Sequence, residues 1–294
     1  YPADQHGRAA LDVVLAEVNQ HMPRVHGDSW VHISEVDAVI EHDALLNELP
    51  TPPEREEDEA MGNLIAEMIP NGACIQLGIG GVPNAVAKSL MNHRDLGIHT
   101  EMFVDSMVDL VERGVANGSQ KAFHPGKALY AFAAGSQRMY EFLDDNPYIE
   151  AHPVSYTNFP PNIARNDNVI SVNSTIEVDL TGQCCSESIG TDQFSGTGGQ
   201  HDYARGAYDS KGGKSMIAFY STARSGEVSR VVSTLRTGAI VTTPRNEVHW
   251  IVSEYGAANL KGKSTRERAK AMISLAHPKF RDELTADAKK LNYI

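Results

Sequence analysis

The chain has 294 residues, of which 41% are hydrophobic and 22% charged, and its formal net charge is −12. This length allows one large or two ordinary domains with a substantial core. The acidic balance argues against a nucleic-acid partner, which needs a basic face. Three cysteines give no disulfide framework and indicate a reduced, cytoplasmic protein. No apolar run approaches membrane-spanning length, so we expect no membrane partner.

The first sixty residues predict few elements. Residues 9–19 fit a helix or a buried strand, and residues 31–33 fit a short strand. Prolines followed by acidic residues between 49 and 59 are typical of a linker. We therefore divide the chain into residues 1–50, a linker at 51–60, and residues 61–294. Because the chain begins in mid-pattern at Tyr1, we expect it to be the C-terminal part of a longer polypeptide.

Beyond the linker, strand and helix patterns alternate. We expect helices at 61–69, 82–90 and 106–113, and a last pair that starts near 265 and 278. The expected strands are 74–77, 98–103, 128–133, 169–172, 176–180, 215–219, 239–242 and 250–253. This alternation predicts an α/β fold with a mainly parallel sheet and helices on both faces.

Two glycine-rich turns could bring backbone amides close to a bulky polar ligand. The first spans 78–83 and lacks the third glycine of a dinucleotide fingerprint, because Pro83 takes its place. The second spans 195–200. Either turn alone could be a tight turn, but two of them at strand ends of a parallel sheet favour a ligand site. Residues 211–215 imitate the end of a P-loop, yet Tyr208 replaces its first glycine.

Glu101 lies on the apolar strand expected at 98–103, where a carboxylate is unusual. It could be a nucleophile or the strand-end partner of a basic residue, and the sequence leaves both open. Glu177 is the rival, but its alternation with apolar neighbours is typical of an exposed strand face. His99 is expected to be a strand-face residue rather than a base. The twelve histidines show no i, i+4 zinc spacing with a glutamate, so we predict no metal site.

These motifs resemble those of the acetyl-CoA hydrolase/transferase family, the family I CoA-transferases, and best match its 4-hydroxybutyrate and butyrate:acetate CoA-transferase branch. The resemblance runs from Met22 to the C-terminus and is carried by segments 77–86, 97–102, 172–183 and 195–200. It implies two similar α/β domains of the NagB/RpiA-like type. The N-terminal one would be largely missing here, with residues 1–50 as its tail. It also implies a homodimer or higher assembly whose cleft lies between domains, so the missing domain would be needed to complete it.

The resemblance also implies the residues of the site. The nucleophilic glutamate falls on Glu101, and an asparagine that hydrogen-bonds near the reacting carbonyl falls on Asn158. Contacts to coenzyme A (CoA) are expected from Gly78, Ile79, Gly80, Gly81, Val82, Ile176, Gly198, Gly199 and Arg224. CoA would be a co-substrate, with no tightly bound cofactor.

The implied reaction moves CoA between a short-chain acyl-CoA, such as 4-hydroxybutyryl-, butyryl- or acetyl-CoA, and a free carboxylate such as acetate. It would follow ping-pong kinetics through an acyl-glutamyl anhydride and a glutamyl-CoA thioester on Glu101. Acyl-CoA hydrolysis is the alternative within the family, if water reaches these intermediates. A non-catalytic CoA-binding or assembly module is the alternative of another class. A sugar-phosphate isomerase-like domain is a weaker one, because no catalytic base with supporting spacing is found.

Overall fold

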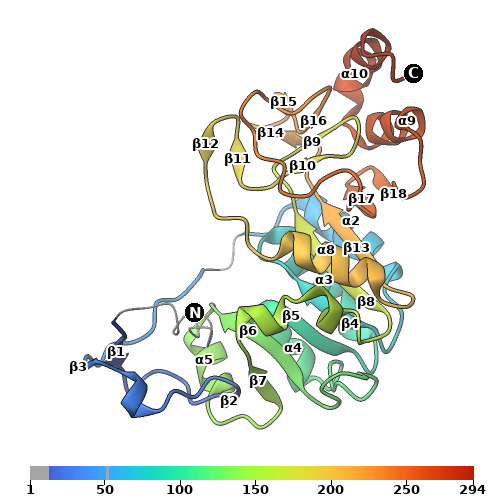
Figure 1. The fold of residues 1–294 in the computed structure, drawn as a ribbon. Coiled ribbons are helices and arrows are strands. Elements are labelled where there is room, and N and C mark those ends of the chain that lie inside the picture. Colours follow the sequence, from blue (N-terminus) through green and yellow to red (C-terminus); the bar gives the residue numbers. More distant parts are fainter. Residues whose placement is uncertain (1–12, 51–52) are drawn as a thin grey trace.

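The computed structural model describes residues 13–50 and 53–294. Its centre is a nine-stranded sheet in the order β18-β17-β13-β8-β4-β5-β6-β7-β2 (Figure 1). Every neighbouring pair in this sheet is parallel except β17–β18. The strands are β2 (His26–Gly27), β4 (Cys74–Leu77), β5 (Gly97–Phe103), β6 (Ala128–Ala133), β7 (Ile149–Ala151), β8 (Val169–Ser174), β13 (Lys214–Ala218), β17 (Trp250–Ser253) and β18 (Gly256–Asn259). The predicted mainly parallel α/β sheet is therefore confirmed.

Helices cover both faces of this sheet. They are α2 (Glu56–Glu67), α3 (Gly81–Ser89), α4 (Asp105–Glu112), α5 (Gln137–Leu143), α6 (Val154–Thr157), α7 (Pro160–Ile163), α8 (Gln200–Asp209), α9 (Thr265–Leu275) and α10 (Pro278–Lys290). Successive side chains along each strand point to opposite faces of the sheet. On β4, Ile75 joins the large core that includes Met61 of α2, whereas Cys74 joins a smaller core with Tyr203 of α8. The layout thus places α8 opposite α2 and α3.

The acidic run that suggested a linker forms the start of a helix. The helix expected at 61–69 begins at Glu56, and its first turn consists of acidic residues. Carboxylates are favourable there because a helix N-terminus carries a partial positive charge. The buried Asp58 side chain also accepts a hydrogen bond of 2.9 Å from the Arg55 amide. Residues 56–60 of the predicted linker are therefore helical, and the domain division itself stays a prediction.

Three other expected elements differ from the structure. The strand expected at 239–242 is irregular, and the amides of Thr242 and Thr243 instead donate to the Cys184 carbonyl at 2.9 and 3.2 Å. The strand expected at 176–180 exists as β9 (Glu177–Asp179), but it belongs to a separate sheet with β10 (Cys184–Cys185) and β16 (Val231–Val232). In place of a strand at 31–33, the chain forms the short 3-10 helix η1 (Ile33–Glu35). Short apolar runs do not reveal their pairing partners.

Residues 13–50 contribute one short strand to the main sheet. The parallel pair β1 (Leu15–Val18) and β3 (Ala38–Glu41) stands apart from the main sheet, and only β2 joins its edge (Figure 1). The pair leaves apolar side chains in solvent, with Leu15 65% and Ile40 56% exposed. The prediction for 9–19 is met by β1 as a strand, although it is exposed and not buried; residues 9–12 lie outside the described part. No described helix has the length and apolar character that a membrane crossing requires.

The sheet has one point where the direction of strand addition reverses. After β4, the chain adds β5, β6 and β7 on one side and then returns to add β8 on the other side of β4. In open α/β sheets, ligands bind at the carboxyl ends of the strands near such a point. The turn 78–83 leaves β4 at this place, and Glu101 lies on the adjacent strand β5.

Candidate active site

Glu101 lies near the carboxyl end of β5 and is half-buried. Its Oε2 accepts a hydrogen bond of 2.9 Å from the Gly199 amide. Within residues 13–50 and 53–294 its carboxylate forms no ion pair, and Oε1 accepts no hydrogen bond. Of the two readings of Glu101 that the sequence left open, pairing with a basic residue is therefore wrong for the described chain. The Gly199 amide thus holds Oε2 of the carboxylate, and Oε1 is available for reaction.

The second glycine turn fits closely around this carboxylate. A Cβ atom on Gly199 would lie 2.4 Å from Nδ2 of Asn158 and 2.7 Å from Oε2 of Glu101. Gly199 is the N-cap of α8, and Gly198 before it has a left-handed φ of 57°. Both positions therefore favour glycine, for different reasons. The carboxylate of Glu101 consequently faces the N-terminus of a ten-residue helix, which favours its negative charge.

Asn158 lies beside Gly199, at the C-cap of α6. Its backbone amide donates to the Val154 carbonyl at 2.8 Å, which fixes its place at the helix end. The residue is only 6% exposed, and its Oδ1 has no hydrogen-bond partner among the described residues. A buried amide oxygen without a partner is costly. The side chain is therefore suited to meet a polar group that enters the space next to Glu101.

His99 shares a face of β5 with Glu101 and is fully buried. Its Nε2 donates to the Thr157 carbonyl at 2.8 Å. Burial, with a smaller effect from the nearby charge of Lys121, lowers the pKa of His99 to about 3. The imidazole is therefore neutral and serves to hold the end of α6 that carries Asn158. The structure agrees with the strand-face expectation and adds this positioning contact, which the sequence did not indicate.

The first glycine turn lies at the end of β4 and, within residues 13–50 and 53–294, forms no hydrogen bond with the Glu101 side chain. The Gly78 amide donates to the Val172 carbonyl of β8 at 2.8 Å, and Gly80 has a φ of 120°. Val82 is buried within α3, whereas Ile79 is 57% exposed and, with Gly80 and Lys88, lines a hollow of about 450 Å³. This turn offers an open backbone surface to a ligand.

A polar cluster beneath this turn was missed by sequence reasoning. A Cβ on Gly81 would lie 2.5 Å from Oδ2 of Asp58 and 2.7 Å from the hydroxyl of Tyr220. Tyr220 donates to Asp58 Oδ1 at 2.6 Å. The guanidinium of Arg230 lies 5.7 Å from the Tyr220 ring, and its buried Nε lacks a partner among the described residues. These residues are up to 172 positions apart, so no spacing signal could have joined them.

The other predicted CoA contacts are less defined. Ile176 is half-buried, and its amide donates to the Cys185 carbonyl at 3.0 Å. Arg224 is exposed in the turn between β14 (Thr222–Ala223) and β15 (Val228–Ser229), with a φ of 50°. The structure gives neither residue a contact with Glu101. Their roles as CoA contacts stay predictions.

Glu177 is not on an exposed strand face, as its pattern had suggested. It is only 5% exposed, and its Oε2 lies 3.0 Å from Nε of Arg236. The Arg236 amide also donates to Oε1 at 3.2 Å. The separate sheet around β9 buries the residue, which the alternating pattern could not show. Both oxygens are therefore engaged, and Glu177 lacks the available oxygen that Glu101 keeps.

The sequence comparisons agree on one family. Residues 135–288 match the sequence profile of the acetyl-CoA hydrolase/transferase C-terminal domain. The succinyl-CoA:cyclohexane-1-carboxylate CoA transferase of Geobacter metallireducens is 52% identical, over 96% of this chain and 64% of that protein. The 4-hydroxybutyrate coenzyme A transferase of Clostridium kluyveri is 50% identical, over 95% and 65%. The butyryl-CoA:acetate CoA-transferase of Anaerostipes caccae is 45% identical, over 98% and 68%.

The fold comparison agrees with the sequence. The crystal structure of RipA from Yersinia pestis matches with a TM-score of 0.92 and 46% identity, and the match covers 100% of this chain and 70% of that one. The chain spans only 64% and 65% of the length of the first two relatives named above. The resemblance inferred from segments 77–86, 97–102, 172–183 and 195–200 is confirmed: this chain belongs to the acetyl-CoA hydrolase/transferase family.

Proposed function

We propose that this chain carries the nucleophile of a CoA-transferase, and that the nucleophile is Glu101. The observation that supports this most directly is the state of its carboxylate. One oxygen is held by the Gly199 amide at the N-terminus of α8, and the other is left available. A carboxylate is a weak nucleophile, so it must stay ionised, be oriented and escape a permanent ion pair.

The reaction would begin when Glu101 attacks the carbonyl carbon of an acyl-CoA. The C–S bond breaks, CoA leaves as a thiolate, and a mixed acyl-glutamyl anhydride remains. The thiolate then attacks the glutamyl carbonyl, the anhydride C–O bond breaks, and the first carboxylate departs. A glutamyl-CoA thioester is left, and a second carboxylate reverses the two steps. Each step exchanges one anion for another, so no net proton, metal or redox partner is required.

Two donors are placed to stabilise the negative charge that develops on oxygen. The Gly199 amide already reaches the carboxylate of Glu101, and the Nδ2 group of Asn158 lies beside it. Donors that are fixed before the reaction lower the barrier because they need no reorganisation. We assign Asn158 this role, and we assign CoA binding to Gly78–Val82, Ile176, Gly198, Gly199 and Arg224.

The acyl groups we propose are short-chain ones, namely 4-hydroxybutyryl, butyryl or acetyl, with acetate as an acceptor. The names of the relatives support transfer over hydrolysis, since each describes a CoA transferase. CoA would act as a co-substrate and not as a tightly bound cofactor. We further propose that the remainder of an N-terminal domain covers the exposed apolar strands β1 and β3 and completes the cleft, in a homodimer or higher assembly.

The test is to trap the thioester. The intact protein is incubated with acetyl-CoA and treated with borohydride, and the modified peptide is located by mass spectrometry. We expect modification at Glu101 and none in Glu101→Gln, which should still bind CoA in a calorimetric titration. The exposed Glu141→Gln serves as a matched control and should be trapped like the wild type. An adduct that persists in Glu101→Gln would remove this residue from the mechanism.

A further inference from the structure

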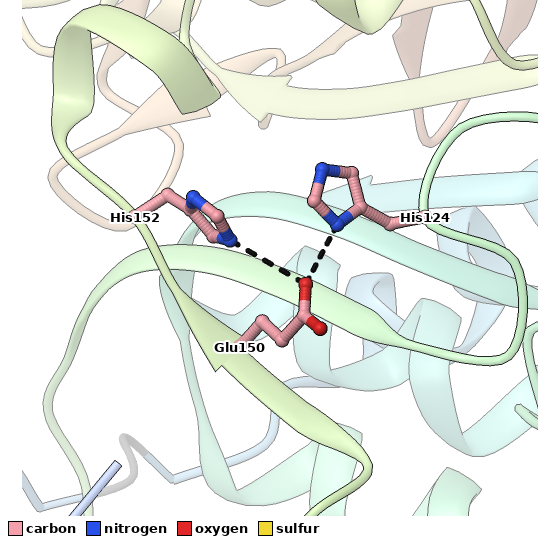
Figure 2. Close-up of side chains that lie close together, drawn as sticks. All are labelled: His124, Glu150 and His152. Carbon is pink, nitrogen blue, oxygen red and sulfur yellow. Dashed lines mark hydrogen bonds and ion pairs between the residues drawn. The ribbon is translucent and has the colours of Figure 1, made fainter. Parts of the chain in front are cut away.

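A second polar cluster lies at the carboxyl end of β7. Figure 2 shows Glu150, on this strand, between the imidazoles of His124 and His152. His152 follows the strand directly, and His124 comes from the loop before β6. One ligand atom from each of the three side chains lies within 4.8 Å of the other two. The residues come from chain segments 26 positions apart, so their convergence is a product of the fold.

The distances in this cluster approach those of a metal site. Oε2 of Glu150 lies 2.6 Å from Nδ1 of His124 and 3.4 Å from Nε2 of His152. Zinc bonds of about 2.0–2.2 Å in a tetrahedron place neighbouring ligand atoms roughly 3.3–3.6 Å apart. The Glu150–His152 pair already has this spacing, and the Glu150–His124 pair must open by roughly 1 Å. The third pair, between the two histidine nitrogens, lies within 4.8 Å. We propose that His124 Nδ1, Glu150 Oε2 and His152 Nε2 bind a divalent transition-metal ion of the zinc type.

The surroundings orient the two imidazoles. The Tyr156 hydroxyl lies 2.9 Å from Nε2 of His124, the nitrogen that faces away from Glu150. A tyrosine hydroxyl can donate or accept, so it suits His124 whether Nδ1 carries a proton or binds an ion. Such outer contacts commonly fix the orientation of metal-binding histidines. The His152 ring also stacks on Tyr156, with centroids 4.9 Å apart and planes at 21°.

One neighbouring charge opposes a cation. Nζ of Lys127 lies 4.0 Å from Oε1 of Glu150, the carboxylate oxygen that is not a proposed ligand. This ammonium group competes for the carboxylate and should weaken the binding of an ion. Removing it without removing a ligand should therefore tighten the site, which distinguishes a real ion site from a histidine–glutamate pair that is only structural.

The site is connected to the segment that carries Asn158. His152 stands two residues before α6, and Asn158 caps the other end of that helix. An ion bound by two residues at the end of β7 and by His124 would tie this short segment to the loop before β6. The protein supplies three ligands, and water would complete the fourth position. This inference does not depend on the role of Glu101.

The experiment is a titration of the intact, chelator-treated protein with Zn²⁺, and with Co²⁺ as a spectroscopic probe. We expect one ion per chain, and at least tenfold weaker binding in His152→Ala and in Glu150→Gln. Lys127→Gln should bind several-fold more tightly. His42→Ala, which removes the exposed pair of His42 with Glu17, is the control and should bind like the wild type.

Unfolding curves recorded without metal show whether each variant is folded. Glu150→Gln keeps the size of the side chain, so it serves if His152→Ala fails to fold. Equal affinity in the wild type, Glu150→Gln and His152→Ala would overturn the proposal. So would a folded wild type that takes up neither ion.

Discussion

The glycine turn before α8 allows a graded test of the proposed site, because three of its glycines differ in the space around them. A Cβ at Gly199 would strike Asn158 and Glu101 at 2.4 and 2.7 Å, whereas a Cβ at Gly198 would stay 3.9 Å from Glu101. A Cβ at Gly196 would meet nothing within 4 Å. Alanine at these positions therefore perturbs the two proposed catalytic side chains to very different degrees.

For Gly199→Ala we expect kcat/KM to fall at least about 100-fold. A displacement of about 1 Å in a reacting group costs on the order of 100-fold in rate. Loss of one donor to a developing oxyanion costs about 100- to 1,000-fold. The smaller figure corresponds to about 2.7 kcal/mol in the activation free energy. Overpacking should also lower the free energy of unfolding by about 1–3 kcal/mol.

Gly198→Ala and Gly196→Ala distinguish the effect of backbone strain from an effect on the proposed catalytic residues. Gly198→Ala must hold a left-handed φ of 57°, which costs about 1–2 kcal/mol in stability, and its loss of rate should be much smaller than that of Gly199→Ala. Gly196→Ala should match the wild type in both respects. The assay follows acetyl-CoA formation from butyryl-CoA and acetate, with urea unfolding as the check on folding. A folded Gly199→Ala protein with wild-type kcat/KM would refute the assignment of Glu101 and Asn158.

Three further predictions concern stability. Burial lowers the pKa of His99 from 6.5 to about 3, so between these pH values only the unfolded chain binds a proton at this residue. Below pH 6, His99 should therefore lower the free energy of unfolding by about 1.4 kcal/mol for each pH unit. Urea unfolding of His99→Gln at a series of pH values should lack this contribution. Tyr220→Phe removes a donor from the buried Asp58 and should cost about 1–3 kcal/mol in urea unfolding, with weaker CoA binding by calorimetry. Arg236→Met leaves the buried Glu177 without its cation and should lower the free energy of unfolding by about 1–3 kcal/mol. The measurement is thermal unfolding, and an unchanged midpoint would contradict this prediction.

The sequence predicted the parts of the fold that local pattern determines. The strands β4, β5 and β13 are short apolar runs next to turn signals, and their positions followed from that pattern. The prediction that residues 56–60 belong to a linker was wrong, because acidic composition is typical both of a solvated linker and of the first turn of a helix. The strand prediction for 239–242 was wrong because its amides bond to Arg236, Ser188 and Cys184 and not to one neighbouring strand, and no local pattern encodes these contacts.

The candidate site divides in the same way. Glu101 could be singled out from its strand, and the family resemblance added Asn158 and Gly199 to the site. The hydrogen bond from the Gly199 amide to Glu101 was not predicted. The cluster at Tyr220 and the cluster at Glu150 could not be predicted, because each joins residues from distant segments. Sheet order brings such residues together, and sheet order depends on long-range pairing. The structure therefore adds most where side chains from different strands meet.

The different environments of the strand residues Glu101 and Glu177 support the choice of Glu101 as the nucleophile. Glu177 is buried and ion-paired by Arg236, so its negative charge is neutralised and both of its oxygens are engaged. Glu101 receives a single amide hydrogen bond and faces the N-terminus of a helix. A helix terminus stabilises a carboxylate by about 0.3–1 kcal/mol, whereas leaving the buried Glu177 carboxylate without its partner costs about 1–3 kcal/mol. The environment of Glu101 thus orients the carboxylate while leaving one of its oxygens available to attack a carbonyl, which the environment of Glu177 does not.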